Sequence, residues 1–441
     1  MNKWLDLYKE KLTSPEEALN CIASATSVIM PLANGQPQAL LNALGNKIMQ
    51  GDLQGMESFS GVDLMPNKYF TPEVADKGTI IDSGFLGPLT RPMVQAGYFT
   101  HSPGHLSDSA NLIMRCRPNF ETAILTVSPM DKHGFFSTGT NTDYCWEVAK
   151  YGPDIKNIIL EVNENMPRTY GRNFFHITEV TALVENNAPL VEIPMFPPQP
   201  EDEAIAHYIA DEIPDNACMQ LGIGALPNLI ASYLKEKKDL SIHSEMLVDG
   251  MVDLYEHGVI TSAKKNFMPN KWVAAFAMGS KKLYDFIDDN MMIEMQPSSY
   301  VVAPHIACLN DNLISINATL EVDLTGQCVS ESIGPRPYSG SGGQADFVKA
   351  SWWSKGGKSF LTCSSTYKDK EGKLHSKIVP TLTNGGVVTV TRPDVQNVVT
   401  EYGIAALKGQ TIRTRVERLI NIAHPDFRDE LRFQAKKLNF I

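Results

Sequence analysis

Apolar residues along the chain form short runs that alternate with stretches of helical spacing. The run SVIMPLANG (27–35) ends in glycine, and the QPQALLNAL that follows has the spacing of an amphipathic helix. The same order of apolar run, glycine turn and helical spacing returns in ACMQLGIGALPNLIASYL (217–234). Alternating strand and helix patterns predict an α/β protein with mainly parallel sheets.

The two stretches belong to a wider repetition. In each, a methionine precedes a glycine by five residues, Gly35 in the first and Gly224 in the second. Farther along, ETAILTVSPMDKHG and LISINATLEVDLTG both end in Asp-x-x-Gly, at Asp131 and Asp323, which lie 96 and 99 residues after those glycines. Matched landmarks at nearly equal separation predict a duplicated α/β domain, with chance repetition of short motifs as the alternative.

A proline-rich segment, APLVEIPMFPPQPEDEAI (188–205), separates the two halves. Four prolines fall between positions 194 and 200, so the segment cannot continue a helix or a central strand. It is typical of an interdomain linker. We expect an N-terminal α/β domain over residues 1–194 and a C-terminal α/β domain over residues 195–441.

Composition narrows the cellular context. A formal net charge of −11 over 441 residues argues against a nucleic-acid partner, which requires a basic face. The charged N-terminus lacks a secretory signal, and no apolar run approaches the roughly 20 residues that span a membrane. Seven scattered cysteines without a C-x-x-C indicate reduced thiols. We expect a cytoplasmic protein without membrane segments.

Two glycine-rich segments are candidates for ligand contact. Gly222-Ile223-Gly224-Ala225-Leu226 follows an apolar run and opens a helix, where free amides face a phosphate or another anion. Pro227 replaces the third Rossmann glycine, so no dinucleotide fingerprint is present, and a structural turn explains the spacing equally well. In the second segment, SGSGGQ (339–344), glycines let the backbone direct N–H groups at an oxyanion; a flexible surface loop is the alternative.

Titratable residues offer one further candidate. Glu245, in His243-Ser244-Glu245-Met246, lies between the apolar DLSIH and a helical stretch, where α/β folds place their ligands. A helix cap or an ion-pair partner is an equally common role for such an acid. His101 and His105 are separated by Ser-Pro-Gly, which does not form a helix, and the other histidines lack ligand spacing. We therefore expect no metal.

At these residues the chain resembles a known family. LGIGALPN, DLSIHSEMLVDGMVDL, INATLEVDLTGQ, SGSGGQADF, VTEYGIAALKG and NIAHPDFR are similar, in order, to segments of the acetyl-CoA hydrolase/transferase family, most closely its 4-hydroxybutyrate and butyrate CoA-transferases. The resemblance spans nearly the whole chain. It implies two similar CoA-transferase-type (NagB/RpiA-like) α/β domains and a homodimer or higher homo-oligomer.

The resemblance also implies roles for individual positions. Glu245 matches the nucleophile, Gly343 the loop glycine beside it, and Asn317 a polar residue of the catalytic site, while Glu401 matches a supporting polar residue. The positions that match CoA-contacting residues are Gly222, Ile223, Gly224, Ala225, Leu226, Leu320, Gly342 and Gly343.

The implied reaction moves coenzyme A between short carboxylic acids, acetate with butyrate or 4-hydroxybutyrate, by ping-pong chemistry through a glutamyl-CoA thioester. Acyl-CoA and CoA are then substrates, and no cofactor is bound permanently. An acyl-CoA hydrolase on the same scaffold is the alternative, and a non-catalytic ligand-binding subunit is a second one. STYKDKEGKLHS (365–376) departs from the family pattern as a surface insertion, and Trp352-Trp353 has no assigned role.

Overall fold

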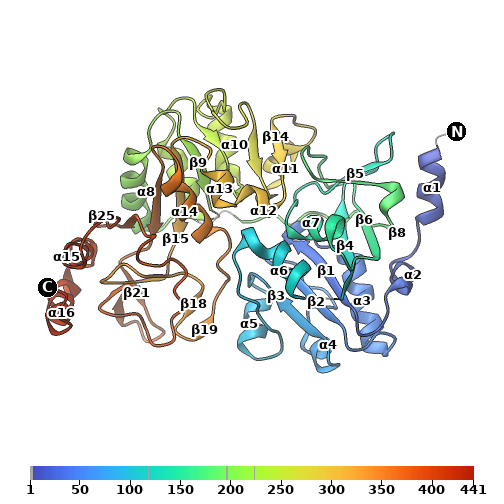
Figure 1. Cartoon of the computed structure of the whole chain (residues 1–441), viewed down its shortest axis with the longest axis horizontal. Coiled ribbons are helices and arrows are strands. Elements are labelled where there is room, and N and C mark those ends of the chain that lie inside the picture. Colours follow the sequence, from blue (N-terminus) through green and yellow to red (C-terminus); the bar gives the residue numbers. More distant parts are fainter. Residues whose placement is uncertain (1–2, 118, 195–196, 223) are drawn as a thin grey trace. The chain divides into compact units, whose positions relative to one another are not determined.

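The computed structural model describes residues 3–117, 119–194, 197–222 and 224–441. Contacts divide the chain into two compact units, one formed by residues 1–193 with 273–301 and the other by residues 194–272 with 302–441 (Figure 1). The segment 273–301 was expected in the second domain, but it clusters with the first unit. Backbone hydrogen bonds explain this placement, because Thr142 N–H donates to Ala275 O at 2.7 Å and Met295 N–H donates to Tyr170 O at 2.7 Å.

The first unit is built on a six-stranded sheet of order β3-β2-β1-β4-β6-β8, in which every pair is parallel. The strands are β1 (Ser27–Leu32), β2 (Glu57–Gly61), β3 (Ile80–Ser83), β4 (Phe120–Val127), β6 (Asn157–Val162) and β8 (Ala182–Glu185). Its helices include α1 (Lys3–Lys11), α2 (Pro15–Ala18), α3 (Gln38–Gln50), α4 (Pro72–Asp76), α5 (Thr90–Gln95), α6 (Ser109–Cys116), α7 (Tyr144–Tyr151), α11 (Lys281–Ile287) and α12 (Ser298–Val301). All of β1 is buried, as expected for a parallel strand covered on both faces.

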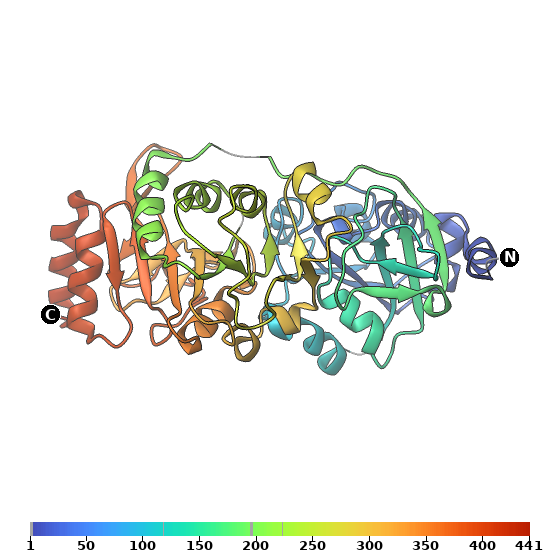
Figure 2. The same ribbon diagram turned by 90° about the horizontal axis from the view of Figure 1, so that it is seen from above.

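The second unit repeats this plan with the order β10-β9-β15-β20-β24-β25. The strands are β9 (Cys218–Leu221), β10 (Ser241–Ile242), β15 (Leu313–Ala318), β20 (Lys358–Thr362), β24 (Asn397–Thr400) and β25 (Gly403–Ala406). Only β25 is antiparallel to its neighbour in this sheet. The helices are α8 (Pro200–Glu212), α9 (Ala225–Tyr233), α10 (Asp249–Glu256), α13 (Pro304–Ala307), α14 (Gln344–Trp353), α15 (Ile412–Ile422) and α16 (Pro425–Lys437). Helix α15 packs on β25, and α16 packs on α15 (Figure 2).

The two sheets share the topology of five strands, and they differ only in their sixth strand, β3 in the first sheet and the antiparallel β25 in the second. If β1, β2, β4, β6 and β8 are matched with β9, β10, β15, β20 and β24, the neighbour order is identical. Gly35 follows β1 and Gly224 follows β9, so the glycine landmarks occupy equivalent turns. The predicted α/β class, with mainly parallel sheets in two similar units, is confirmed.

The predicted linker leads directly into a helix. Pro200 is the first residue of α8, and Gln199 and Asp202 form a capping box at its start. Residues 195 and 196 of the linker lie outside the described part of the chain.

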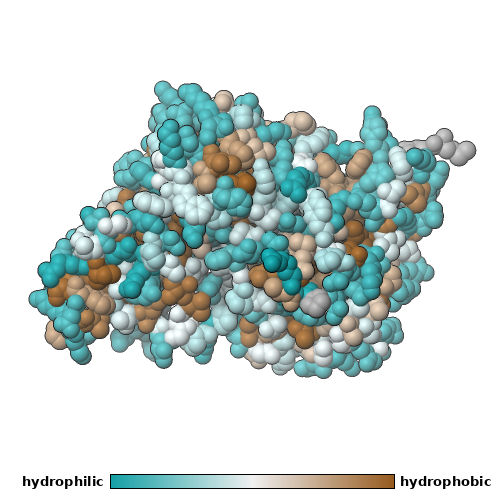
Figure 3. Space-filling view, viewed as in Figure 1, coloured by the Kyte–Doolittle hydropathy of each residue, from teal (hydrophilic) through white to brown (hydrophobic). Residues whose placement is uncertain are grey.

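Large exposed apolar side chains are spread over both units, and the face in Figure 3 shows apolar clusters among polar residues. No helix within the described residues is long and apolar enough to cross a membrane.

Candidate active site

Glu245 lies just beyond the carboxyl end of β10. The two residues before it are fully buried and tied to β9: His243 N–H donates to Met219 O at 3.2 Å, and Ser244 Oγ donates to Leu221 O at 3.3 Å. Strand β9 ends at Leu221, directly before Gly222. These hydrogen bonds therefore hold Glu245 at the same sheet edge as Gly222, where ligands bind in open α/β sheets.

The glycine loop before α14 reaches the Glu245 carboxyl group. Gly343 N–H donates to Glu245 Oε2 at 2.8 Å, and a Cβ on Gly343 would lie only 2.2 Å from that oxygen. The φ of Gly343 is −92°, which any residue can adopt. Glycine is therefore required here by the close approach of the carboxyl group and not by the backbone conformation. Gly342, with φ +53°, does adopt the left-handed conformation that favours glycine. The structure thus brings two predicted segments together.

The surroundings of Glu245 raise its pKa, so that the carboxyl group is less readily ionised than in water. Burial raises the pKa of Glu245 to about 7; the Gly343 N–H opposes this shift and the charge of Asp346 adds to it. Asp346 is itself buried, in the first turn of α14. The Glu245 side chain is partly exposed. A carboxylate that titrates near neutral pH and remains accessible suits a nucleophile.

The first unit carries an acid at the equivalent place, after β2, and it differs from Glu245. Asp63 is fully buried, and it accepts hydrogen bonds from Gln36 Nε2 at 2.6 Å and from Ser83 Oγ at 3.2 Å. Its two oxygens are therefore both engaged by side chains. Of these two topologically equivalent carboxylates, only Glu245 is open to a reagent.

The turn between β9 and α9 leaves open space. Gly224 precedes α9 with φ +126°, which requires glycine. A Cβ at Gly224 would meet nothing within 4 Å, and one at Gly222 would meet only Ile316 O at 4.0 Å. Ala225 and Leu226 form the first turn of α9, whose free amides carry partial positive charge. Ile223, also predicted to contact CoA, lies outside the described residues.

Asn317 is the penultimate residue of β15 at the same edge, and it is held by Gln220, which was not among the predicted residues. Gln220 Oε1 accepts hydrogen bonds from Asn317 Nδ2 at 3.1 Å, Ser315 Oγ at 2.8 Å and Ile316 N–H at 3.1 Å. Asn317 Nδ2 also donates to Ser315 Oγ at 2.9 Å. A glutamine within the apolar run ACMQLG was the available signal, since a buried polar side chain needs partners.

The two other predicted residues have structural contacts. Leu320 follows β15, and its N–H donates to Val329 O at 2.8 Å. The Glu401 carboxylate accepts from Ser365 N–H at 2.8 Å and from Ser365 Oγ at 2.5 Å, so it anchors the chain after β20. Among the described residues, no hydrogen bond joins Leu320 or Glu401 to Glu245. Trp352 and Trp353 end α14, each 54% exposed.

Comparison with known proteins gives two family matches. Residues 2–194 match the acetyl-CoA hydrolase/transferase N-terminal domain, and residues 279–435 match the C-terminal domain of the same family.

Curated relatives extend over nearly the whole chain. The succinyl-CoA:cyclohexane-1-carboxylate CoA transferase of Geobacter metallireducens is 42% identical, with 98% of this chain and 97% of the relative covered. The 4-hydroxybutyrate coenzyme A transferase of Clostridium kluyveri is 41% identical, with 99% of each chain covered. An acetyl-CoA hydrolase of Yarrowia lipolytica is 29% identical over 52% of this chain and 43% of its own length. Among solved structures, RipA from Yersinia pestis superposes with a TM-score of 0.90 at 39% identity, covering 99% of this chain and 100% of RipA.

Proposed function

The chain belongs to the acetyl-CoA hydrolase/transferase family, and we propose that it moves coenzyme A between short carboxylic acids through a thioester on Glu245. The observation that carries this proposal is the 2.8 Å hydrogen bond from Gly343 N–H to Glu245 Oε2, which marks where negative charge is stabilised. A transferase is favoured over a hydrolase, because relatives that span nearly the whole chain are named transferases, whereas the hydrolase above matches about half of it.

The first half of the reaction forms the covalent intermediate. The Glu245 carboxylate attacks the carbonyl carbon of acyl-CoA, the C–S bond breaks, and a mixed anhydride and CoA thiolate result. The thiolate then attacks the glutamyl carbonyl carbon, which releases the donor acid as its carboxylate and leaves the Glu245–CoA thioester. In this second step the oxyanion develops on the glutamyl oxygen that Gly343 N–H contacts. An incoming carboxylate reverses both steps, so no net proton is transferred.

CoA is bound as a substrate by the open sheet edge. We propose that Gly222, Ile223, Gly224, Ala225, Leu226, Leu320 and Gly342, together with Gly343, contact it. The open side of the turn before α9 supports this assignment, since helix N-terminal amides favour anions and no Cβ of Gly222 or Gly224 intrudes. Binding energy from the unreactive part of CoA can then position the thioester for attack.

Two polar residues support the site. Asn317 belongs to a network that Gln220 orients, and we assign it to the polar wall that faces the reacting carbonyl groups. Glu401 acts through Ser365, by holding the segment after β20 in place.

The acids are proposed from the relatives' names and from the family resemblance. Acetate exchanging with butyrate or 4-hydroxybutyrate is the expected pair, since a relative covering 99% of this chain is named for 4-hydroxybutyrate. We also propose a domain boundary at residues 194/195, with residues 273–301 returning to the first domain, a homodimer or higher homo-oligomer, and a cytoplasmic location. The free state of all seven cysteines supports the location.

The test separates transfer from hydrolysis. The enzyme is mixed with acetyl-CoA with and without butyrate, and butyryl-CoA and free thiol are measured together. We expect acid-dependent formation of butyryl-CoA, little thiol release, and loss of both reactions in Glu245→Gln. Thiol release at the same rate without an acceptor acid would instead identify a hydrolase.

A further inference from the structure

A pocket in the first unit lies on the outer face of a two-stranded ribbon. Strands β5 (Phe135–Ser137) and β7 (Phe174–His176) pair antiparallel, with Phe136 opposite Phe175. Because side chains alternate along a strand, these two face the core and are fully buried, while their neighbours face the other way. The neighbours Phe135, Ser137 and Phe174 line a pocket of about 250 Å³. In liquid water, about eight molecules occupy this volume, at ~30 Å³ each.

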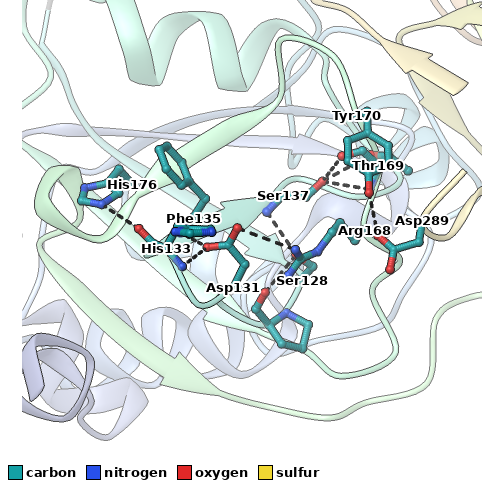
Figure 4. Close-up of polar contacts among 11 residues, drawn as sticks. Ser128, Asp131, His133, Phe135, Ser137, Arg168, Thr169, Tyr170, His176 and Asp289 are labelled. Atoms are coloured by element: carbon teal, nitrogen blue, oxygen red, sulfur yellow. Dashed lines mark hydrogen bonds and ion pairs between the residues drawn. The ribbon is translucent and has the colours of Figure 1, made fainter. Parts of the chain in front are cut away.

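Aromatic rings form the apolar wall of this pocket. Phe135 and Phe174 lie edge to face with ring centroids 6.4 Å apart, and Phe135 is 43% exposed. The other lining residues are Asp131, Arg168 and Tyr170 (Figure 4). We refer to these six residues as the Arg168 pocket. A small apolar cavity with a few polar groups has the composition of a ligand site.

The backbone of Arg168 is held by hydrogen bonds, whereas its guanidinium group makes no hydrogen bond to a described residue. Its N–H donates to Asp288 Oδ1 at 2.7 Å, and its carbonyl accepts from Asp289 N–H at 2.8 Å. Tyr170, from the same segment, donates its hydroxyl to Asp289 Oδ1 at 2.9 Å. The Arg168 guanidinium, 34% exposed, has one described partner, Asp131 Oδ2 at 3.7 Å, which is beyond hydrogen-bond length. Its five N–H donors are therefore available to a planar acceptor.

Asp131 restricts which anion fits. Its Oδ1 accepts from the N–H groups of His133 at 2.8 Å and Phe135 at 2.9 Å, so this carboxylate is held rigidly at the polar end. Although burial acts in the opposite direction, these amides and the charge of Arg168 lower the pKa of Asp131. A dianion such as phosphate would be repelled by this charge more strongly than a monoanion.

We propose that the Arg168 pocket binds a small carboxylic acid with an apolar or aromatic body. The carboxylate accepts two parallel hydrogen bonds from the Arg168 guanidinium, and the body lies against Phe135 and Phe174. The site belongs to the first unit and uses none of the residues assigned to thioester chemistry on Glu245. It makes the chain a binder of free organic acids at a second place, independently of the proposed transfer reaction.

The test measures binding of 4-fluorobenzoate to the full chain by ¹⁹F NMR, without acyl-CoA, so no turnover is needed. Arg168→Gln should remove one equivalent of bound probe or weaken that site at least tenfold. The matched control is Arg172→Gln, which removes the same charge from an exposed neighbour of the same segment and should bind like the parent. Arg168→Lys keeps the charge but not the planar fork, and should give intermediate affinity.

A second substitution tests the proposal even if the arginine variants do not fold. Phe135→Leu shortens the aromatic wall and should also weaken binding, with an unchanged melting temperature because Phe135 is exposed. The cationic counterpart 4-fluorobenzylamine should not bind at this site. Equal binding by Arg168→Gln and Arg172→Gln would overturn the proposal, as would preference for the amine or an absence of probe binding to the parent.

Discussion

Gly343→Ala perturbs the contact on which the proposed chemistry depends. The added Cβ would lie 2.2 Å from Glu245 Oε2, whereas non-bonded heavy atoms are at their best separation about 3.5–4.0 Å apart. The loop or the carboxyl group must therefore shift by at least about 1 Å. A displacement of that size costs about 10²-fold in rate, and loss of an oxyanion donor costs about 10²–10³-fold, or ~2.7–4 kcal/mol. Because φ is −92° and the nearest other side chain, Val302 Cγ1, would lie 3.3 Å from the added Cβ, alanine requires only a small further adjustment of the fold.

We expect Gly343→Ala to lower kcat for butyryl-CoA formation from acetyl-CoA by about 10²–10³-fold, with an unchanged melting temperature. Gly222→Ala is the comparison variant: its Cβ would meet only Ile316 O at 4.0 Å in the protein but would face the proposed CoA site, so we expect it to raise KM for acetyl-CoA while kcat falls less than about tenfold.

A double-mutant cycle sharpens the test. Glu245→Asp withdraws the carboxyl group by one methylene and relieves the clash with the alanine. Gly343→Ala should then cost less in the Glu245→Asp background than in the parent, because contacting residues are not additive. Equal fold-losses in both backgrounds would refute the idea that the glycine is needed to admit the carboxyl group.

Three further predictions follow from the same sheet edge. Since the reactive form of Glu245 is the carboxylate and its pKa is raised to about 7, kcat/KM for thioester formation should rise with pH through about 7. In the unfolded chain the pKa of Glu245 is nearer 4.5, so the free energy of unfolding falls as the pH rises from about 4.5 to about 7. Glu245→Gln should therefore raise the melting temperature at pH 8 but not at pH 4. Gln220→Leu removes the acceptor shared by three donors and should lower stability by about 1–3 kcal/mol per buried donor, measured by urea denaturation. Glu401→Gln should loosen Ser365, so that amides of residues 366–376 exchange faster with deuterium in mass spectrometry while distant amides do not.

The periodicity of the sequence predicted the architecture because it is a local property. The apolar runs around Met30 and Met219 became equivalent buried strands, and the glycines that follow them became equivalent turns. Segment 273–301 shows the limit of this reasoning. Its short strands β12 (Trp272–Ala274), β13 (Phe276–Ala277) and β14 (Ile293–Met295) have no sequence feature that marks which unit they join. Backbone hydrogen bonds to residues far away in the chain determine that placement.

The candidate site was predictable only in part. A strand-end acid such as Glu245 resembles many helix caps, and the family resemblance singled it out. Its partner Gly343 lies 98 residues away, a separation that no local pattern encodes. Gln220 was visible as a polar residue in an apolar strand, but its role depends on the parallel pairing of β9 with β15, which sets it beside Ser315 and Asn317.

The most direct test of the account is mass spectrometry of the chain after incubation with acetyl-CoA alone. We predict covalently attached CoA on the peptide that contains Glu245, removed by an added carboxylate and absent from Glu245→Gln. Borohydride treatment should reduce the same glutamyl group and end activity. Attachment to a different residue, or full turnover by Glu245→Gln, would contradict the central claim.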